Sequence, residues 1–233
     1  MKDQAVAIIT ARGGSKRIPK KNIKDFCGKP ILAYSIEAAL KSELFKEVMV
    51  STDSEEIAEV ARRYGAAVPF MRSNKTSDDY ATTADVLMEV LCEYEKRGET
   101  FQYMACIYPT APFVTAEKLI QGMELLKKEN ANMVMPVVPF SYPPQRGYII
   151  QNQRLNMKYK ENFSRRSQDL EKIYHDCGQF YLYQIDEYRR QKGIIMEGII
   201  PIVVSELQVQ DIDNEIDWKL AEMKYSLLRC AER

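Results

Sequence analysis

The segment EVMVSTDSEEIAEVARRYGAAVPF, residues 47–70, shows the pattern that decides the fold. It opens with an apolar run of strand length, 47–51, and closes with another, 66–70. Between the two runs, apolar residues recur at the spacing of one helix face: Ile57, Val60, Ala61 and Tyr64. Ser54 supplies a start signal for that helix and Gly65 a stop signal. The segment therefore predicts a strand, a helix and a second strand in succession.

The same alternation extends over most of the chain. Apolar runs of strand length lie at residues 5–9, 47–51, 66–70, 103–108, 132–138, 178–183 and 199–204. Amphipathic segments rich in Glu, Lys, Ala and Leu separate most of them, at residues 30–42, 54–65, 83–98 and 116–130. Strands that alternate with helices predict an α/β fold with a mostly parallel sheet, right-handed crossovers and helices on both faces. In such sheets ligands bind beyond the carboxyl ends of the strands.

Length and charge bound the class of protein. The 233 residues, 45% of them hydrophobic, are enough for a large core, and we expect a single domain, 1–233. Lys plus Arg equals Asp plus Glu at 33 each, so no overall field attracts nucleic acid or an anionic membrane surface. Binding of an anion must therefore be local, and we expect neither a nucleic-acid nor a membrane partner.

Cysteine and histidine usage narrows the chemistry. The five cysteines are scattered and form no C-x-x-C pair, which indicates reduced thiols and a cytoplasmic protein. The chain shows no apolar stretch near the ~20 residues that cross a bilayer, and its first residues lack the apolar region of a signal peptide. A single histidine, His175, argues against Ser-His-Asp catalysis and excludes a multi-histidine metal site.

The alternation of strands and helices lapses between residues 140 and 172. This stretch is rich in Tyr, Pro, Gln, Asn and Arg and has no clean period. Structureless loops of that length are unusual in compact domains. We interpret it as a β-rich excursion from the sheet, such as a hairpin, that contacts the substrate or a second subunit.

A concentrated positive charge follows the first predicted strand. Within residues 11–24, ARGGSKRIPKKNIK, no acid accompanies the six basic side chains Arg12, Lys16, Arg17, Lys20, Lys21 and Lys24. Gly13 and Gly14 allow backbone conformations closed to other residues and a close approach to a ligand, while Ser15 and nearby amides can donate hydrogen bonds. A polyphosphate fits this chemistry, although the spacing matches neither the P-loop nor the Rossmann glycine pattern. The alternative is a solvated basic turn.

Near the carboxyl end, the segment DIDNEIDW places acids at Asp211, Asp213 and Asp217. If residues 209–213 are extended, Asp211 and Asp213 point to the same side and offer hard oxygen ligands for Mg²⁺, which phosphates and water could complete. The alternative is that an aspartate, Asp213 more readily than Asp211, caps the following helix. Asp217 is interpreted as a solvated or salt-bridged residue of that helix.

Several motifs together resemble a known family. They are ITARGGSKRIPKKNIKDFCGKPILAYSIEAA (9–39), VSTDSEEIAEVARRYGA (50–66), IYPTAPF (107–113), RSQDL (166–170), YHDCGQFY (174–181) and VQDIDNEIDW (209–218). In this order they are similar to the CMP-sialic acid synthetase family, the cytidylyltransferases that activate nonulosonic acids. The resemblance spans nearly the whole chain and implies a Rossmann-like nucleotidyltransferase fold, a homodimer, and Mg²⁺ as cofactor. It also implies transfer of CMP from CTP to the anomeric hydroxyl of the sugar acid, with release of pyrophosphate.

The resemblance implies roles for individual residues. It places the CTP triphosphate and nucleotide on Arg12, Gly13, Gly14, Ser15, Lys16, Lys21, Asn22, Arg72, Thr82 and Thr83, and the metal on Asp211 and Asp213. Arg12, Lys21 and Asp211 are the candidate catalytic residues, Asp211 as metal ligand and as a base acting through the metal. Where the family usually has Arg-Pro, this chain has Arg72-Ser73, which leaves the rigidity of that loop open. Thr82 and Thr83 could equally cap the helix that follows.

The sugar is expected to differ from sialic acid. The family usually carries a glutamine where this chain has Tyr108. The family's motif also usually ends with an arginine, whereas here it ends at Phe113 without one. An aromatic face with one hydroxyl suits a less hydroxylated sugar, and the motifs are similar to those of pseudaminic acid cytidylyltransferases. Candidate substrate-binding residues are Tyr108, Thr110, Arg166 (with Arg165 as substitute), Gln168, His175, Asp176 and Gln179.

Three alternative functions remain open on the sequence alone. One is activation of sialic or legionaminic acid by the same reaction. Another is CMP-Kdo synthetase or a different sugar-nucleotide pyrophosphorylase, although the sequence GGSKRIPKKN (13–22) argues against both. A third is a non-catalytic module that binds a nucleotide or RNA through the basic loop, which would leave Asp211 and Asp213 without a purpose.

Overall fold

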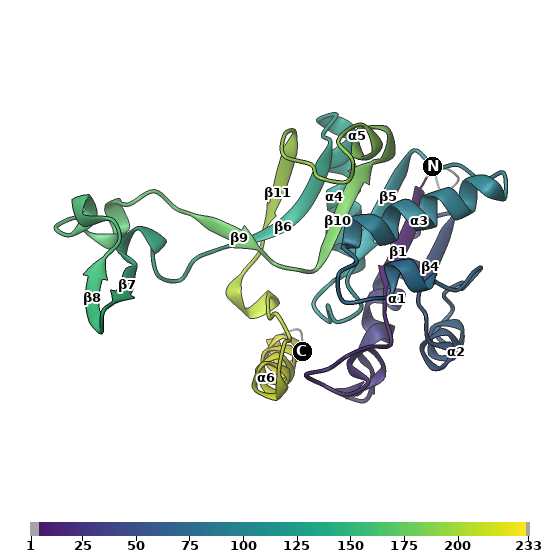
Figure 1. Ribbon diagram of the computed structural model, residues 1–233, viewed down its shortest axis with the longest axis horizontal. Helices are drawn as coiled ribbons and strands as arrows, with labels where there is room; N and C mark the ends of the chain where they lie inside the picture. The colour runs from purple at the N-terminus through teal and green to yellow at the C-terminus, as the bar shows by residue number, and fades with distance from the viewer. Residues whose placement is uncertain (1–4, 232–233) are drawn as a thin grey trace.

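A computed structural model describes residues 5–231 and contains a seven-stranded mixed sheet in the order β11-β6-β10-β5-β1-β4, with β9 paired to β6 (Figure 1). The strands of this sheet are β1 (Ala5–Thr10), β4 (Glu47–Ser51), β5 (Tyr103–Ile107), β6 (Met133–Pro139), β9 (Tyr174–Asp176), β10 (Phe180–Gln184) and β11 (Ile199–Val203). The helices are α1 (Ile31–Ser42), α2 (Glu55–Arg63), α3 (Thr83–Lys96), α4 (Ala116–Lys128), α5 (Ile185–Arg190) and α6 (Glu215–Ala231). The predicted α/β class is confirmed.

Most strands of the sheet run in the same direction. β1 is parallel to β4 and to β5, and β11 is parallel to β6. β10 lies antiparallel between β5 and β6, and the short β9 is antiparallel to β6. Because parallel strands end at the same edge, the loops after β1, β4 and β5 meet at one edge of the sheet.

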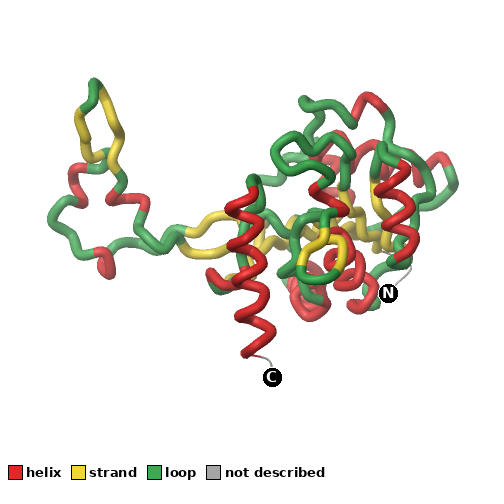
Figure 2. Tube along the Cα trace, turned by 90° about the horizontal axis from the view of Figure 1, so that it is seen from below, coloured by secondary structure: helices red, strands yellow, loops and turns green. Residues whose placement is uncertain are grey.

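The alternation of β1 divides the core into two layers. Ala7 and Ile9 pack with apolar side chains of α1 and α4, whereas Val6 and Ile8 pack with those of α3 and α5. These four residues of β1 are fully buried, as expected for a central strand with helices on both faces. The helices seen in Figures 1 and 2 therefore cover both faces of the sheet.

The segment 47–70 forms the predicted strand and helix but not the second strand. Ser54 is the N-cap of α2 and its hydroxyl accepts a hydrogen bond from the amide of Ile57, and Gly65 follows the helix with a φ of 93°. Both predicted boundary signals are confirmed. The predicted strand 66–70 is wrong: only Ala67 pairs, in an isolated bridge to Met49. Pro69 has no amide hydrogen, so the pairing cannot continue along this edge.

The C-terminal helix is joined to the N-terminal loop by a separate apolar cluster. Ile212, Trp218 and Ala221 are buried against Ile18, which lies within the basic segment, and Phe26, which follows it. Lys24 reinforces this contact, because its ammonium group lies 4.6 Å from the centroid of the Trp218 ring and pairs with Glu215 on α6. Sequence ends that are almost 200 positions apart thus lie side by side.

The segment between β6 and β9 projects from the body as an arm (Figures 1 and 2). It contains the two-stranded sheet β7 (Tyr148–Gln151) with β8 (Arg154–Met157) and three short 3₁₀ turns, η4 (Pro144–Arg146), η5 (Lys160–Asn162) and η6 (Ser167–Asp169). A second small sheet, β2 (Asp25–Phe26) with β3 (Lys29–Pro30), precedes α1. Further 3₁₀ turns are η2 (Lys21–Ile23), η3 (Asn74–Thr76) and η7 (Glu206–Gln208).

Candidate active site

The basic loop lies at the carboxyl end of β1, where the fold predicts a ligand site. Each of its cations has a specific partner. Arg12 and Lys16 both pair with Asp79, Arg17 pairs with Asp213 at 2.7 Å, Lys20 with Glu56 at 2.7 Å, and Lys24 with Glu215 at 2.7 Å. The alternative of a merely solvated basic turn is thereby disfavoured, since the loop is bound to three other parts of the chain.

Lys21 differs from the other cations of the loop. Among the described residues no carboxylate lies within ion-pair distance of Lys21, and its ammonium group instead donates a 2.7 Å hydrogen bond to the carbonyl oxygen of Ile212. Burial lowers the pKa of Lys21, and the nearby charges of Asp213 and Asp211 oppose this shift. A desolvated cation without a bound acid is available for an anionic ligand.

The two aspartates after β11 lie next to the basic loop, and Asp213 contacts it directly. Ile212 between them is buried, while Asp211 is exposed and Asp213 is half-buried, which is the alternation of an extended segment. Asp213 reaches Arg17, and the charges of both aspartates act on Lys21. The structure therefore brings the predicted cations and the predicted acids together.

Helix α6 is capped by residues other than Asp213. The side-chain oxygen of Asn214 accepts hydrogen bonds from the amides of Ile216 and Asp217, at 2.8 and 3.1 Å. In return, the carboxylate of Asp217 accepts from the amides of Asp213 and Asn214, at 3.0 and 3.1 Å. The capping alternative for Asp213 is thus wrong, and Asp217 is a capping residue rather than a solvated or salt-bridged one.

The metal prediction can be tested against the donors present. Among residues 5–231 no group of three or more His, Cys, Asp or Glu side chains is arranged to hold a metal ion. Two carboxylates two residues apart fit Mg²⁺ that keeps water and takes its remaining ligands from phosphates, as this ion commonly does. Asp211 and Asp213 are therefore a suitable but partial donor set, and the other ligands would have to come with the nucleotide.

Three adjoining cavities surround the basic loop. One of about 360 Å³ extends from Arg12 and Lys21 to Thr110 and Asp213. A second, of about 280 Å³, extends from Arg12 to Arg72 and the start of α3. A third, of about 530 Å³, lies between the basic loop and residues 77–80. Arg12 lines all three cavities, so its guanidinium stands at their junction.

The glycines of the loop have a different role from the predicted one. Neither Gly13 nor Gly14 has a positive φ, so the expectation of conformations closed to other residues is wrong. A Cβ atom on Gly13 would lie 3.1 Å from the Cβ of Ser54, whereas one on Gly14 would meet nothing within 4 Å. The amide of Gly13 donates a 2.8 Å hydrogen bond to Asp53. Gly13 is needed for close packing against the start of α2, and Gly14 leaves the loop surface open.

Asn22 and Arg72 fix the walls of the site. Asn22 is buried and donates from its side chain to the carbonyl oxygen of Arg12 at 2.8 Å, so it holds the basic loop. Arg72 is buried, donates to the hydroxyl and the carbonyl oxygen of Ser51, and lines the second cavity. Burial lowers the pKa of Arg72, while Asp53 and Glu89 oppose the shift. Arg72 can contact a ligand only from within this wall.

The loop after Arg72 is held by hydrogen bonds in place of a proline. The carboxylate of Glu89 on α3 accepts from the amide and the hydroxyl of Ser73, at 2.8 and 2.7 Å, and from the hydroxyl of Thr76 at 2.6 Å. Although burial opposes ionisation, the hydrogen bonds from Thr76 and Ser73 keep the pKa of Glu89 below its usual value. The open question about this loop is answered, because Ser73 uses the amide hydrogen that a proline would lack.

Thr82 and Thr83 have separate roles. Thr82 is the N-cap of α3 and forms a capping box with Asp85, so for Thr82 the capping alternative is confirmed. Thr83 is the first residue of the helix, and its side chain is close enough to the Tyr108 hydroxyl to counter the rise in the Tyr108 pKa that burial causes. Both threonines line the second cavity.

Tyr108 packs on a second tyrosine that reaches Asp176. The rings of Tyr108 and Tyr181 meet edge to face at 5.6 Å. The Tyr181 hydroxyl donates a 2.5 Å hydrogen bond to the carboxylate of Asp176. Burial, followed by the bond to Asp176, raises the pKa of Tyr181, so this hydroxyl stays protonated as a donor. Tyr181 thus connects two predicted substrate-binding residues, Tyr108 and Asp176.

Most of the other predicted substrate-binding residues lie outside the cavities at the basic loop. Arg166, Gln168 and the substitute Arg165 are exposed on the arm, and none of them lines a cavity at the basic loop. His175 is exposed at the base of the arm and its ring packs on Phe140 at 4.7 Å. Gln179 is buried, and its amide nitrogen donates to the carbonyl oxygen of Gln208 while its own oxygen has no partner. Within one chain, none of these five residues lines a cavity at the basic loop, and their roles stay predictions.

Two acids in the site were not singled out from the sequence. Asp53 orients Gly13, and Asp79 binds Arg12 and Lys16. The signal for Asp53 was its place in the STDS motif directly after a strand, where ligand loops begin. For Asp79 the sequence offered only an acidic loop, because its partners lie 63 or more positions away.

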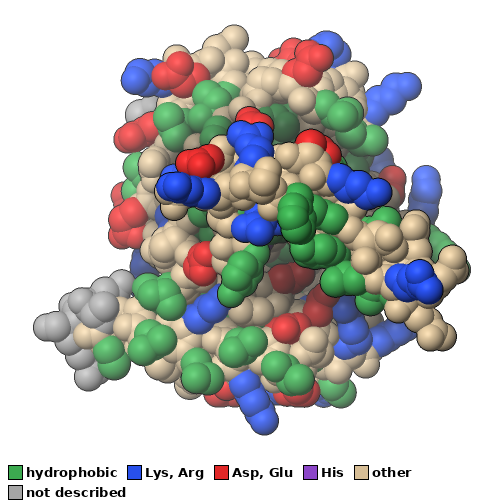
Figure 3. Space-filling model, turned by 90° about the vertical axis from the view of Figure 1, so that its left-hand side faces the viewer, with side chains coloured by type: hydrophobic (Ala, Val, Ile, Leu, Met, Phe, Trp, Pro, Cys, Tyr) green, Lys and Arg blue, Asp and Glu red, His purple; other side chains and the backbone are tan. Residues whose placement is uncertain are grey.

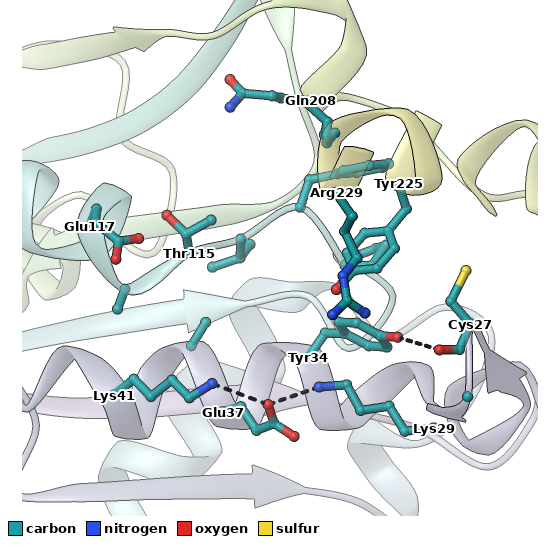
Figure 4. A pocket seen from close by; sticks show the side chains of 17 residues that line it. Cys27, Lys29, Tyr34, Glu37, Lys41, Thr115, Glu117, Gln208, Tyr225 and Arg229 are labelled. Carbon is teal, nitrogen blue, oxygen red and sulfur yellow. Dashed lines mark hydrogen bonds and ion pairs between the residues drawn. The ribbon is translucent and has the colours of Figure 1, made fainter. Parts of the chain in front are cut away.

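Another cavity, of about 590 Å³, lies between α1, α6 and residues 112–117 (Figure 4). Glu37 on its floor neutralises Lys29 and Lys41, at 2.8 and 3.5 Å. The rings of Tyr34 and Tyr225 form one wall. None of the predicted site residues lines this cavity, so we place the candidate active site at the basic loop.

The sheet, the basic loop beyond its first strand and the paired aspartates beside that loop define a nucleotide-binding α/β protein of the nucleotidyltransferase type. The profile of a family described as "Cytidylyltransferase" matches residues 6–200, and the chain belongs to this family. The prediction of an enzyme that transfers a nucleotidyl group is thereby confirmed.

Curated relatives and solved structures agree with this assignment. The chain is 39% identical over 223 residues to a pseudaminic acid cytidylyltransferase of Campylobacter jejuni, covering 95% of this chain and 96% of the relative. It is 34% identical to a CMP-N,N'-diacetyllegionaminic acid synthase of Legionella pneumophila, with 93% and 94% covered. A structure of CMP:2-keto-3-deoxy-manno-octonic acid synthetase complexed with CTP superposes with a TM-score of 0.69 at 17% identity, covering 97% of this chain and 99% of that one, and shows a shared fold.

Proposed function

We propose that the enzyme transfers CMP from CTP to the anomeric hydroxyl of pseudaminic acid and produces CMP-pseudaminic acid and pyrophosphate. The observation that carries the proposal is the contact of Lys21 with Ile212 and of Arg17 with Asp213 beside one cavity. The 39% identity to the pseudaminic acid cytidylyltransferase of Campylobacter jejuni supports the choice of sugar. The fold, the basic loop and the family agree with a reaction at the α-phosphorus of a nucleoside triphosphate.

In this mechanism the sugar hydroxyl loses its proton to solvent as its oxygen attacks the α-phosphorus, and the bond from that phosphorus to the pyrophosphate oxygen breaks on the opposite side. Negative charge accumulates on the phosphoryl oxygens and on the departing pyrophosphate, where positioned cations lower the barrier. Arg12, Lys16 and Lys21 are placed to supply them from one loop. Lys21 is best suited, because it is partly desolvated and a charge interaction is stronger where water is excluded.

Asp211 and Asp213 are the residues that would hold Mg²⁺. The ion, when bound, would neutralise phosphate oxygens and lower the pKa of the attacking hydroxyl. Asp211 is exposed, and its carboxylate has no hydrogen-bond partner within residues 5–231, so it is free to take a ligand. Asp213 would exchange its contact with Arg17 for the metal, which would release that guanidinium towards the phosphates.

The sugar is assigned to the region of Tyr108, Thr110 and Asp176. Tyr108 presents an aromatic ring and one hydroxyl, and this suits a sugar with fewer hydroxyl groups than sialic acid. Arg166, Gln168 and His175 could join this region only from a second subunit, since in their own chain they lie on or at the base of the arm. Gln179 would act indirectly, because its backbone carbonyl accepts from the amide of Tyr108 at 2.8 Å.

We include a homodimer in the proposal. The arm exposes large apolar side chains, among them Tyr142, Ile150, Leu155 and Phe163. Helix α6 exposes a second row at helical spacing, Ile216, Leu220, Met223 and Leu227. Figure 3, seen from the side of the arm, shows hydrophobic side chains over this face and along its lower edge, where α6 lies. Exposed large apolar side chains on both elements are typical of an association surface, and equilibrium sedimentation of the whole chain tests the dimer.

The cytoplasm is the proposed compartment. Cys27, Cys92, Cys106, Cys177 and Cys230 are all free thiols, as expected where disulfides do not persist. Within the described part of the chain, no helix combines the length and the apolar character required to cross a bilayer.

Release of pyrophosphate from CTP, measured separately with pseudaminic, legionaminic, sialic and Kdo acids, tests the function. We expect turnover to be fastest with pseudaminic acid. Legionaminic acid is the second candidate, because the synthase of Legionella pneumophila is 34% identical over nearly the whole chain. Turnover with sialic but not pseudaminic acid would show that the sugar is wrong while the class of reaction is right. No turnover of CTP with any of these acids would contradict the function.

A further inference from the structure

A carboxylate of the chain itself occupies two of the cations assigned to the triphosphate. One oxygen of Asp79 lies 3.0 Å from the guanidinium of Arg12, and the other contacts the ammonium group of Lys16. The same guanidinium nitrogen of Arg12 donates a 3.1 Å hydrogen bond to the carbonyl oxygen of Asp78. These contacts hold residues 77–80 against the basic loop, along one side of the cavity of about 530 Å³ that lies between them.

The segment that carries Asp79 is anchored at both ends. On the N-terminal side, Ser73 and Thr76 are bound to Glu89, and the hydroxyl of Ser77 donates to the carbonyl oxygen of Ser73 at 2.7 Å. On the C-terminal side, Thr82 begins α3. The turn between the anchors is closed by Asp78, whose carboxylate accepts from the amides of Tyr80 and Ala81 at 2.9 and 2.7 Å. The position of Asp79 is therefore built into the loop.

The ion pairs that Asp79 forms with Arg12 and Lys16 are weak enough for a phosphate to replace the carboxylate. The side chains of Arg12, Lys16 and Asp79 are 41%, 77% and 46% exposed, and pairs this exposed contribute little to stability. The hydrogen bond and the charge of Lys16 hold the pKa of Asp79 below its usual value, so the carboxylate is ionised at neutral pH. A di- or triphosphate brings more charge and more acceptor oxygens to the same two cations than one carboxylate does.

We propose that Asp79 competes with the polyphosphate for Arg12 and Lys16 and thereby sets how much charge a ligand needs in order to occupy the basic loop. This inference rests on the proposed function, in which Arg12 and Lys16 bind the triphosphate of CTP. Asp79 would withdraw when a polyphosphate arrives, since two anions cannot share the cations without repulsion, and would return as pyrophosphate leaves. Competition of this kind weakens binding of the nucleotide and favours release of the product.

The test compares Asp79→Asn and Asp79→Ala with the matched control Glu56→Gln. Glu56 pairs with Lys20 of the same loop at 2.7 Å, is 52% exposed, and its substitution changes the net charge by the same amount as Asp79→Asn. Neither Glu56 nor Lys20 lines a cavity at the basic loop, so the control preserves the phosphate-binding cations. The probes are inorganic pyrophosphate and CTP, titrated calorimetrically into the whole protein.

We expect both Asp79 variants to bind pyrophosphate and CTP about 3- to 10-fold more tightly than the wild type, from the loss of two exposed ion pairs. Glu56→Gln should leave both affinities unchanged. In turnover assays the KM for CTP should fall in the Asp79 variants while kcat stays within about twofold.

Three results would overturn the inference. Equal tightening in Glu56→Gln would show a general charge effect, weaker binding in the Asp79 variants would show that Asp79 assists the ligand, and absence of pyrophosphate binding in all proteins would show that the loop is no phosphate site. Failure of the proposed function would look different, because it would appear in the wild type as absence of CTP turnover with every sugar acid.

Discussion

The ammonium group of Lys21 lies 2.7 Å from the carbonyl oxygen of Ile212, although 191 positions separate the two residues. This hydrogen bond links the loop after the first strand to the segment that carries Asp211 and Asp213. Ile18, Ile212 and Trp218 belong to one buried apolar cluster, which holds these two segments together. The cations and the carboxylates proposed for catalysis are therefore brought together by apolar packing as well as by the ion pair between Arg17 and Asp213.

Lys21→Ala is expected to reduce turnover about 100-fold or more, because loss of one positioned charge at a developing phosphate anion costs this much. The thermal midpoint should change little, since burial of Lys21 without a carboxylate partner disfavours its charged form. Steady-state kinetics and thermal unfolding on the same preparation provide the measurement. Lys20→Ala is the control, because Lys20 is exposed and pairs only with Glu56. A loss of stability in Lys21→Ala that matches the loss of activity would show a structural lysine.

Asp211→Ala is expected to abolish turnover and to leave stability within about 0.5 kcal/mol of the wild type, because the side chain is exposed. Excess Mg²⁺ should not restore activity. The contrasting variant is Asp217→Ala, which removes the acceptor for the amides of Asp213 and Asn214 and should cost about 1 kcal/mol of stability. Activity titrated against Mg²⁺ and urea unfolding separate the two effects. An unchanged dependence on Mg²⁺ in Asp211→Ala would remove this residue from the metal site.

The sequence predicted the elements whose pattern is long and local. The helices α1, α2, α3 and α4 lie where amphipathic segments predicted them, within a few residues, and α6 follows Asp213 as expected. The short elements β9 and α5 were missed, because 3 and 6 residues are too few to show a period. The strand predicted at 66–70 failed because an apolar run does not show whether its amides can pair, and Pro69 cannot donate.

The site residues could be predicted where they lie close together in one segment. They could not be predicted where the contact depends on how distant segments pair. The basic loop and the paired aspartates could be found because each is concentrated within a few positions. The contact between Tyr108 and Tyr181 depends on the antiparallel register of β10 with β5, in which Tyr181 lies opposite Cys106. Arg166 and Gln168 were assigned by resemblance, and within one chain the arm carries them away from the cavities, so their role stays a prediction.

Tyr108→Gln is expected to shift the ratio of kcat/KM for pseudaminic over sialic acid about 10-fold towards sialic acid. An amide can pair with hydroxyl groups that the tyrosine ring leaves unpaired, and one such hydrogen bond is worth about this factor. Competition between the two sugars in a single assay measures the ratio. Tyr183→Phe is the control, because Tyr183 lies on the same strand as Tyr181 and is equally buried, and within residues 5–231 its hydroxyl contacts no predicted substrate-binding residue. An unchanged ratio in Tyr108→Gln would place the sugar pocket elsewhere.

Lys118 should make the stability of the protein depend on pH. Its side chain is buried under the loop that follows Tyr108, and the ammonium group donates to the carbonyl oxygen of Phe113 at 3.0 Å. Burial lowers the pKa of Lys118 to about 8, so in the folded state the amine loses its proton more readily than in the unfolded chain. Between pH 8 and about 10.5 the unfolded chain binds more protons, and the free energy of unfolding therefore rises with pH across this window.

Lys118→Met removes this dependence and tests its sign. Below pH 8 the wild type bears the full cost of a buried charge, about 3 kcal/mol from the size of the pKa shift, offset in part by the bond to Phe113. We expect the variant to be more stable than the wild type at pH 7 and to lose most of that advantage at pH 9.5. Urea unfolding of both proteins at the two pH values provides the measurement, and groups common to both cancel in the difference. A difference that does not change with pH would mean that Lys118 is charged equally in the folded and unfolded states.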